Sequence, residues 1–358
     1  MKIAVDFEST QGQRTGIGSF AANLFAAIQK EQSGLEFIFY EKKSSRAGLN
    51  SLGRITWESV EIPMRVLKDR PRVVYSPGFS PAYRCAARRV VTVHDLIGLA
   101  YPANQKSFSY LYWSRWLPFT LKRAHRLIAS SESTRRDIRR FLKISEAQVP
   151  LVPLACSKLF IKRDEKKRPG EVCLKYNLTG PFMISVGTLE PRKNLIKLLE
   201  AYARLKKRGK NGFSLLIVGK PGAAEDRLRA FISENHLDGS VKIAGYASEE
   251  DLACLYNAAM GYVNVSLYEG FGLSVLEAMS CGLSGVVSNR SSLPEVSGDT
   301  AISVNPENTD EIAEALWNFT SDGRLRQSLS EAAYLRSKAF SAEKMARAMI
   351  NIFKKEAA

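Results

Sequence analysis

The sequence lacks the features of a membrane-spanning or secreted protein. Its 358 residues contain no run of about 20 consecutive apolar residues, the length that a transmembrane helix needs. The first residues, MKIAVDFEST, have no basic start, apolar stretch or small-residue cleavage site of a signal peptide, and they indicate a buried strand followed by a turn. We therefore expect a cytoplasmic protein that does not cross the membrane.

Residues that commonly bind metals are few and scattered. No close Cys pair or Cys/His cluster has the spacing of a zinc site. The residues concerned are Cys85, Cys156, Cys173, Cys254, Cys281, His94, His125 and His236. Small core cysteines in a reducing compartment fit this distribution. We expect no metal and no cofactor apart from the substrate.

Acidic residues are scarce in the N-terminal part of the chain. The formal net charge is +16, and residues 1–163 hold 27 Lys and Arg against 12 Asp and Glu, whereas the remainder holds 25 against 24. An excess of positive charge in one part of a protein attracts anionic partners such as phospholipid surfaces, nucleic acid or phosphorylated acceptors.

Aromatic residues accompany these cations in the segment 108–126. The aromatic residues are Tyr110, Tyr112, Trp113 and Trp116, and the cations around and after them are Arg115, Lys122, Arg123, Arg135, Arg136, Arg139 and Arg140. Such a mixture suits a lipid headgroup layer, and it predicts peripheral attachment to the anionic inner face of the plasma membrane. Alternatively, the aromatic residues belong to the core and the cations only keep the protein soluble.

Short apolar runs alternate with longer amphipathic stretches, as in parallel sheets covered by helices. The chain is too long for one core, since cores rarely grow past about 250 residues. The predicted strands are KIAVDF, FIFY, VVYSP, VVTVHDL, RLIASS and VPLVPLA in the first part, and PFMISVG, FSLLIVGK, VKIAGY, GYVNVS, SGVVSN and AISV in the second. We predict an α/β fold with two Rossmann-like doubly wound domains, at residues 1–165 and 166–340, joined by an exposed linker near 162–171. A final helix over 341–358, capped by Ser341, should pack on the first domain.

The segment 268–288 carries the sharpest chemical signal. A strand ends in a polar turn with Glu269, Gly270 and Gly272, and a helix begins near Leu273. Glycines let a ligand approach the backbone, and free N–H groups at a helix start bind anions such as a diphosphate. Glu277, about one turn into the helix, could accept hydrogen bonds from ribose hydroxyls. Alternatively, both glutamates are solvent-exposed acids near a helix N-terminus.

Three other segments place polar residues after predicted strands. The turn 187–194 offers Arg192 and Lys193 just before a helix, where cations oppose the helix dipole and so suggest bound phosphates rather than a solvated surface. His94 and Asp95 follow an apolar strand, at the edge where ligands of open α/β sheets bind, although a lone histidine is as often structural. The loop 12–18, with Gly12, Gly16 and Gly18, could cradle a phosphate but lacks GxGxxG spacing.

Together these segments resemble the retaining glycosyltransferases of family 4, which have the GT-B architecture of two facing Rossmann-like domains with a cleft between them. The resemblance covers essentially the whole chain, including the glycine loop, His94-Asp95, GTLEPRKN at 187–194, the spacing of Glu269 and Glu277, and FS at 340–341. One departure is that Thr188 follows Gly187 where many members have an arginine, so the arginine role falls to Arg192.

The resemblance implies a metal-independent hexosyltransferase that uses a nucleotide sugar. Catalytic roles would fall to Lys193 and Arg192 on the diphosphate, Glu269 on the sugar, and His94 from the other domain, with Asp95 near the acceptor. Donor-binding positions would be Gly16, Gly18, Gly187, Gly245, Tyr246, Gly270, Phe271, Gly272, Leu273 and Glu277. The departing phosphate would take the acceptor's proton in a front-side displacement.

The motifs HDL and EPRKN most resemble those of bacterial mannosyltransferases of surface-polysaccharide and lipopolysaccharide pathways. GDP-mannose is therefore the expected donor, with a UDP-sugar second, and the expected acceptor is a glycan or lipid-linked oligosaccharide. A nucleotide-sugar epimerase on the same fold is an alternative. A nucleic-acid-binding protein is suggested only by charge, and we expect no nucleic-acid partner.

Overall fold

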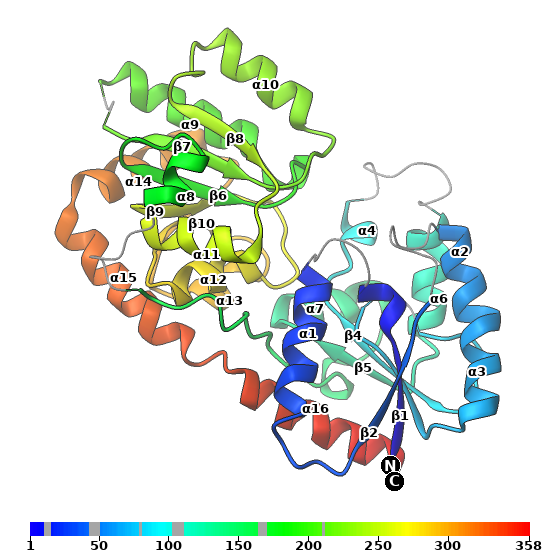
Figure 1. Cartoon of the computed structure of the whole chain (residues 1–358). Helices are drawn as coiled ribbons and strands as arrows, with labels where there is room; N and C mark the ends of the chain where they lie inside the picture. Colours follow the sequence, from blue (N-terminus) through cyan, green and yellow to red (C-terminus); the bar gives the residue numbers. More distant parts are fainter. Residues whose placement is uncertain (11–15, 43–50, 79–80, 102–110, 164–169, 210–211) are drawn as a thin grey trace. The chain divides into compact units, whose positions relative to one another are not determined.

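A computed structural model describes residues 1–358 apart from 11–15, 43–50, 79–80, 102–110, 164–169 and 210–211 (Figure 1). The chain forms two compact units. Unit 1 comprises Met1–Ala155 with Phe340–Ala358, and unit 2 comprises Cys156–Ala339. The boundary between the units thus follows Ala155, whereas the sequence suggested residue 165. No helix of the described part is long and apolar enough to cross a membrane.

Unit 1 is built on a parallel sheet of five strands in the order β2-β1-β3-β4-β5. The strands are β1 (Lys2–Asp6), β2 (Glu36–Tyr40), β3 (Val73–Ser76), β4 (Arg88–Val93) and β5 (Arg126–Ala129). β1, β3 and the inner part of β4 are buried almost throughout, because helices cover both faces of the sheet. Five of the six strands predicted in this part are confirmed.

The sixth predicted strand, VPLVPLA at 149–155, does not form. It contributes a single bridge between Leu151 and Ala129, the last residue of β5. Pro150 and Pro153 lack the backbone N–H that a ladder requires, so the pairing does not extend.

One face of the unit 1 sheet is covered by α1 (Gly16–Ile28) and α16 (Ala342–Ala357). Tyr75 of β3 meets Phe353 of α16 edge to face, with 5.0 Å between ring centroids. Ser341 caps α16 as predicted, accepting a hydrogen bond from the N–H of Lys344. Glu356, 2% exposed, then accepts hydrogen bonds from Arg88 and Arg126, which fixes the terminal helix on unit 1.

The other helical segments of unit 1 lie between the strands, and several of them cover the second face of the sheet, whereas η1 packs beside α1 and β2. They are η1 (Phe7–Thr10), α2 (Ser51–Thr56), η2 (Trp57–Glu61), α3 (Ile62–Asp69), α4 (Ile97–Ala100), η4 (Tyr112–Trp116), α6 (Leu117–Leu121), α7 (Glu132–Asp137), η5 (Ile138–Leu142) and η6 (Glu146–Gln148). α2, the π-helical η2 and α3 follow one another without a break and form one helix, helix 51–69. Its inward residues pack with Ala4 of β1 and Val74 of β3.

Three of the predicted membrane-facing aromatic residues, Tyr112, Trp113 and Trp116, point inward. Tyr112 is 4% exposed and Trp116 is partly buried, and both donate hydrogen bonds to the buried carboxylate of Glu58. Trp113 packs against the apolar cluster of β4 and β5. The expectation that these three side chains meet lipid headgroups is therefore wrong, because Glu58 and the apolar core bind them inside. Tyr110 lies outside the described residues.

Unit 2 contains a parallel sheet of six strands in the order β11-β10-β9-β6-β7-β8. The strands are β6 (Phe182–Val186), β7 (Ser214–Val218), β8 (Val241–Gly245), β9 (Gly261–Asn264), β10 (Gly285–Ser288) and β11 (Ile302–Val304). All six were predicted from the sequence. Chain order runs outward from β6 on one side and outward from β9 on the other, so the topology switches between β6 and β9. Open α/β sheets bind ligands at the carboxyl ends of the strands beside such a switch.

The helical segments of unit 2 are α8 (Gly170–Lys175), η8 (Pro191–Lys193), α9 (Leu195–Lys207), α10 (Glu225–Glu234), α11 (Glu249–Ala258), α12 (Leu273–Ser280), α13 (Leu293–Ser297), α14 (Thr309–Ser321) and α15 (Gly323–Ser337). α9, α10 and α14 share one large apolar core with β6, β7 and β9. Of the predicted linker 162–171, residues 164–169 lie outside the described part.

Candidate active site in unit 2

The two sharpest sequence signals lie at the switch point of the unit 2 sheet. Lys193 ends the turn that follows β6, and Glu269 lies in the turn that follows β9. β6 and β9 are hydrogen-bonded neighbours, so the two turns emerge side by side at the carboxyl edge. The backbone also joins them, because Leu267 N–H donates to the carbonyl of Arg192 at 2.9 Å.

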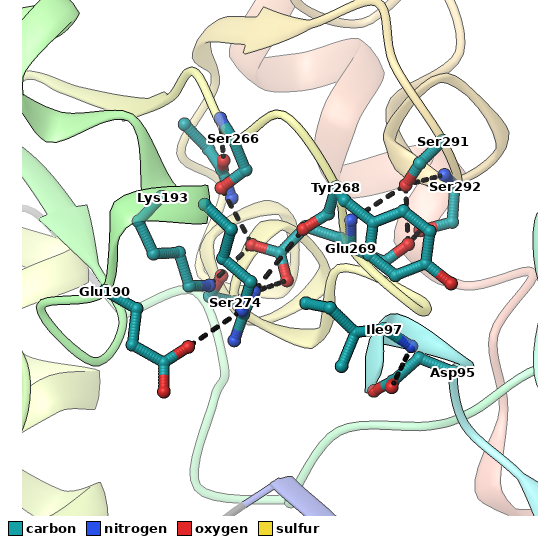
Figure 2. A network of polar contacts seen from close by, with 12 residues as sticks. Asp95, Ile97, Glu190, Lys193, Ser266, Tyr268, Glu269, Ser274, Ser291 and Ser292 are labelled. Carbon is teal, nitrogen blue, oxygen red and sulfur yellow. Dashed lines mark hydrogen bonds and ion pairs between the residues drawn. The ribbon is translucent and has the colours of Figure 1, made fainter. Parts of the chain in front are cut away.

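Glu269 binds both predicted phosphate-binding cations (Figure 2). Lys193 Nζ lies 2.5 Å from Glu269 Oε1, and Arg192 Nη1 lies 3.0 Å from Oε2. Arg192 also donates through Nε to Glu190 at 2.9 Å. The side chains of Lys193 and Glu269 are each 11% exposed, so solvent screens this pair little.

The carboxylate at the centre of this cluster is ionised. Burial raises the pKa of Glu269, but the positive charges of Lys193 and Arg192 outweigh it and lower the pKa to about 2. Glu269 is therefore ionised at neutral pH and is a weak base. Because Arg192 also pairs with Glu190, two carboxylates balance the two cations, but the Glu190 side chain is 44% exposed and solvent screens its charge more.

Two backbone features allow Lys193 to lie here. Gly187 has a φ of 152°, and a Cβ on it would stand 2.6 Å from Lys193 Cε, so any larger residue would displace the lysine. Asn194 follows in the left-handed conformation and donates to the carbonyls of Val265 and Pro306. The turn that carries the cations is thus bonded to the ends of β9 and β11.

Three serines that sequence reasoning missed fix the position of Glu269. Ser266 donates to its Oε1 at 2.9 Å, and the hydroxyls of Ser291 and Ser292 donate to its backbone carbonyl at 2.5 and 2.9 Å. The N–H of Glu269 in turn donates to Ser291 Oγ at 2.8 Å. Ser291 holds a left-handed φ of 54°, unfavourable for a residue with a Cβ. A polar residue at such a φ is a structural signal, invisible in the sequence, that the turn after β10 supports the glutamate.

α12 begins beside this glutamate, as predicted. Its N-cap, Gly272, is left-handed and has no side chain to cap the helix. Gly270 and Phe271 precede it, and Leu273 is the first helical residue. The start of α12 therefore has the composition of an anion-binding helix N-terminus next to the Lys193–Glu269 pair.

Glu277 lies on α12 and is partly buried. Burial raises its pKa to about 8, which the hydrogen bond from the Tyr256 hydroxyl at 3.3 Å and the charge of Lys193 only partly offset. That Lys193 acts on this carboxyl indicates that the two predicted donor-binding side chains lie near each other. Near neutral pH, Glu277 can therefore gain or lose a proton when a ligand binds beside it.

The end of β8 offers an exposed aromatic ring at the same edge. Gly245 has a φ of 71°, and a Cβ on it would meet no atom within 4 Å. Tyr246 is 45% exposed, and Lys220 Nζ lies 5.4 Å from its ring centroid. Both predicted base-binding residues are thus accessible to a ligand.

The remaining candidate residues, among them His94 and Asp95, belong to unit 1. His94 Nε2 lies 2.7 Å from the carbonyl of Pro77, so Nε2 carries the proton and Nδ1 is the acceptor. Burial lowers the pKa of His94, which favours the neutral ring. Asp95 accepts a hydrogen bond from the N–H of Ile97 at 3.0 Å, which gives it a structural role at the start of α4 (Figure 2).

The glycine loop of unit 1 lies partly outside the described residues. Gly12 is in the part not described, Gly16 is the exposed first residue of α1, and Gly18 is buried. A Cβ at Gly16 would meet no atom within 4 Å, so packing does not demand glycine there. Close approach of a ligand would demand it.

Comparison with known proteins agrees with this geometry. The family described as "Glycosyl transferases group 1" matches residues 174–336, and "Glycosyltransferase Family 4" matches residues 27–156. The O-antigen chain mannosyltransferase B of Escherichia coli is 33% identical over 293 residues, which are 80% of this chain and 76% of that protein. The serotype-specific mannosyltransferase WbdA of Escherichia coli is 30% identical over 267 residues, and the match spans only 32% of its length.

Solved structures share the fold at low identity. Sucrose-phosphate synthase from Thermosynechococcus elongatus superposes with a TM-score of 0.81 at 19% identity, over 99% of this chain and 98% of that one. HepE from Anabaena, solved with UDP and glucose, gives a TM-score of 0.73 at 15% identity, over 99% and 100% of the two chains.

The fold and the carboxyl-edge site therefore define a glycosyltransferase of the GT-B class. The chain belongs to glycosyltransferase family 4, and unit 2 carries the group 1 glycosyltransferase domain. The roles of its individual residues remain predictions.

Ser291 should position Glu269 for catalysis. We expect Ser291→Gly and Ser291→Ala each to lower kcat by roughly tenfold or more, because a displaced reacting group costs rate. The Kd of the nucleotide should change little, since these bonds hold the glutamate that is predicted to bind the sugar. Ser291→Ala should also be less stable than Ser291→Gly by about 1 kcal/mol, because only alanine retains the left-handed strain.

Steady-state kinetics, nucleotide titration and thermal unfolding of both variants test this prediction. Ser303→Ala, at an exposed position of β11, is the matched control. Unchanged kcat in both Ser291 variants would contradict a positioning role.

Glu277 should make nucleotide binding depend on pH. Its carboxyl is protonated below a pKa of about 8, and only the ionised form accepts two hydrogen bonds from ribose. Nucleoside diphosphate affinity should therefore rise as the pH increases from 6.5 towards 9, by up to about tenfold per pH unit below the pKa. In Glu277→Gln, this pH dependence of the affinity should disappear, and only the pH dependence caused by ionisation of the phosphates should remain. The same pH profile in both proteins would contradict the assignment.

Proposed function

We propose that this glycosyltransferase moves a mannosyl group from GDP-mannose to a glycan or lipid-linked saccharide, with retention of configuration and without a metal ion. The observation that carries the proposal is the Lys193–Arg192–Glu269 cluster at the switch point of unit 2. Two relatives support the choice of mannose, because one is named an O-antigen chain mannosyltransferase and the other a serotype-specific mannosyltransferase. A UDP-sugar remains the second candidate, since HepE was solved with UDP.

The donor would exchange partners within this cluster. A nucleoside diphosphate brings two neighbouring negative charges, which can replace Glu269 on Lys193 and Arg192 while Glu190 keeps its bond to Arg192. Glu269 would then be free to accept hydrogen bonds from the hydroxyls of the sugar. The N–H groups at the start of α12 would add to the diphosphate site, and Glu277 would hold the ribose.

The same two cations support a metal-independent reaction. Charge that develops on the leaving diphosphate needs fixed positive groups aimed at it. Lys193 is held against Gly187 and Arg192 is bonded to Glu190, so both are in place before the reaction. They would do for the diphosphate what a magnesium ion does in other transferases.

The electrostatics of Glu269 favour a front-side displacement. Two cations hold the pKa of Glu269 at about 2 before the donor binds, and once they turn to the diphosphate the sugar hydroxyls would engage this carboxylate, so it would serve neither as base nor as nucleophile. The departing phosphate would therefore take the acceptor's proton while the new bond forms on the same face of the sugar. The donor phosphate leaves with its bonding electron pair, and the sugar keeps its anomeric configuration.

The charge of unit 1 supports the proposed acceptor and cellular location. This unit holds 28 Lys and Arg against 14 Asp and Glu. We place the enzyme in the cytoplasm, peripherally on the inner face of the plasma membrane, where a lipid-linked saccharide is accessible. Attraction of a basic unit to an anionic leaflet supports this location.

Incubation with GDP-mannose, UDP-glucose and a mannoside acceptor tests donor, stereochemistry and metal dependence together. We expect NMR of the product to reveal an α-mannoside formed from GDP-mannose, at a rate that EDTA does not lower. Without acceptor the donor's sugar should keep its configuration at C2. Interconversion of donor epimers without acceptor would favour the epimerase alternative, and a β-linked product would contradict retention.

Lys193→Ala should lower kcat by roughly 10²–10³, the scale for removing one pre-organised charge stabiliser. Arg192 continues to neutralise Glu269, so the variant should fold, which thermal unfolding can check. Lys197→Ala, four residues along on α9 and paired with Glu200, is the control and should keep its kcat. A kcat near that of the wild type in Lys193→Ala would rule out the proposed role.

A further inference from the structure

Helix 51–69 has apolar side chains on both of its faces. Trp57, Ile62 and Val66 point inward and are at most 2% exposed, packed in the core of unit 1. A surface helix usually keeps one apolar face and leaves the other polar. The second apolar face therefore calls for an explanation.

The outward apolar residues form a stripe along the helix. Leu52, Val60, Met64 and Leu67 are 61%, 47%, 58% and 68% exposed. We call these four residues the outer stripe. Figure 1 shows α2 and α3 running as one rod along unit 1.

The π-helical turn Trp57–Glu61 brings the stripe into line. In an uninterrupted α-helix, residues twelve positions apart, such as Leu52 and Met64, would point about 120° apart. The wider π turn advances less per residue and offsets most of that angle. The alignment of these side chains thus depends on the irregular turn.

Buried polar bonds hold the stripe outward. Arg54 forms ion pairs with Asp6 of β1 and with Glu58, and Trp57 Nε1 donates to Asp6 at 2.9 Å. Glu58 also accepts the hydrogen bonds from Tyr112 and Trp116. Rotation of the helix would leave these buried charges without their partners, at a high cost in free energy.

Cations accompany the stripe and indicate its partner. Lys68 and Arg70 are exposed at the end of the helix, and Arg65 lies over the Trp57 ring at 4.9 Å. An apolar stripe beside cations is typical of helices that lie in an anionic lipid interface. A second copy of the chain fits less well, because two strongly basic units would repel each other.

We infer that the outer stripe of helix 51–69 inserts into the headgroup layer of an anionic bilayer and anchors the enzyme there. This inference rests on the proposed function, because it supplies the surface by which the enzyme reaches a lipid-linked acceptor. It also replaces Tyr112, Trp113 and Trp116 as the membrane-facing residues, since the fold turns these three inward.

Co-sedimentation with vesicles tests the anchor. We expect the wild type to bind vesicles of phosphatidylglycerol and phosphatidylcholine, and to bind phosphatidylcholine alone far less. The double variant Met64→Glu/Leu67→Glu should lower binding to the anionic vesicles by about tenfold or more, since it removes apolar insertion and adds like charge. Leu335→Glu, on α15 of unit 2 and 71% exposed in the wild type, is the matched control and should bind as the wild type does.

Transfer to a soluble mannoside separates this inference from the proposed function. The double variant should keep its kcat with a soluble acceptor, because the outer stripe contributes no residue to the site of unit 2. Wild-type binding that ignores anionic lipid, or equal binding of the wild type and the double variant, would overturn the anchor. So would a lipid-free dimer that the double variant abolishes, since the stripe would then belong to a second copy.

Discussion

The candidate site depends on one buried interaction, the contact of Glu269 with both Lys193 and Arg192. Glu190 also pairs with Arg192, so the two cations are balanced, and solvent screens the inner pair of Lys193 and Glu269 little. The same contact keeps the carboxylate ionised and the cations oriented before any donor arrives. Pre-organised charge of this kind costs no reorganisation during the reaction, which is why it stabilises a transition state better than water does.

The rest of unit 2 is arranged so that this contact can form. The switch between β6 and β9 brings together two turns that lie far apart in sequence. Gly187 makes room for the lysine, and Ser291 accepts a strained φ in order to bind the backbone of Glu269. An unfavourable backbone conformation persists only where the surrounding bonds impose it. Such strained residues occur most often at functional sites. The sheet topology and the local strain thus serve the same side chain.

Most of the strands could be predicted from the sequence, because apolar runs alternate with amphipathic stretches in parallel sheets. Polar residues that follow buried strands gather at the carboxyl edge, which accounts for the proximity of Lys193 and Glu269. This rule could not predict that they bind each other, because that depends on the register of β6 against β9. Nor could it identify Ser291, whose importance lies in a φ angle and in a contact 22 residues away.

Two predictions failed for physical reasons that the sequence only hinted at. Two prolines kept 149–155 from forming a strand, although its apolar pattern suited one. Tyr112 and Trp116 turned inward because Glu58, more than fifty residues earlier in the chain, offers them a buried carboxylate. Local composition could not distinguish interfacial aromatic residues from aromatic residues that satisfy a buried charge.

A crystal structure with GDP-mannose bound would test the central claim most directly. The account predicts the diphosphate within hydrogen-bond distance of Lys193 and Arg192, the ribose against Glu277, and Glu269 turned from its cations towards the hexose. A donor bound elsewhere, with the contact between Lys193 and Glu269 intact, would contradict it.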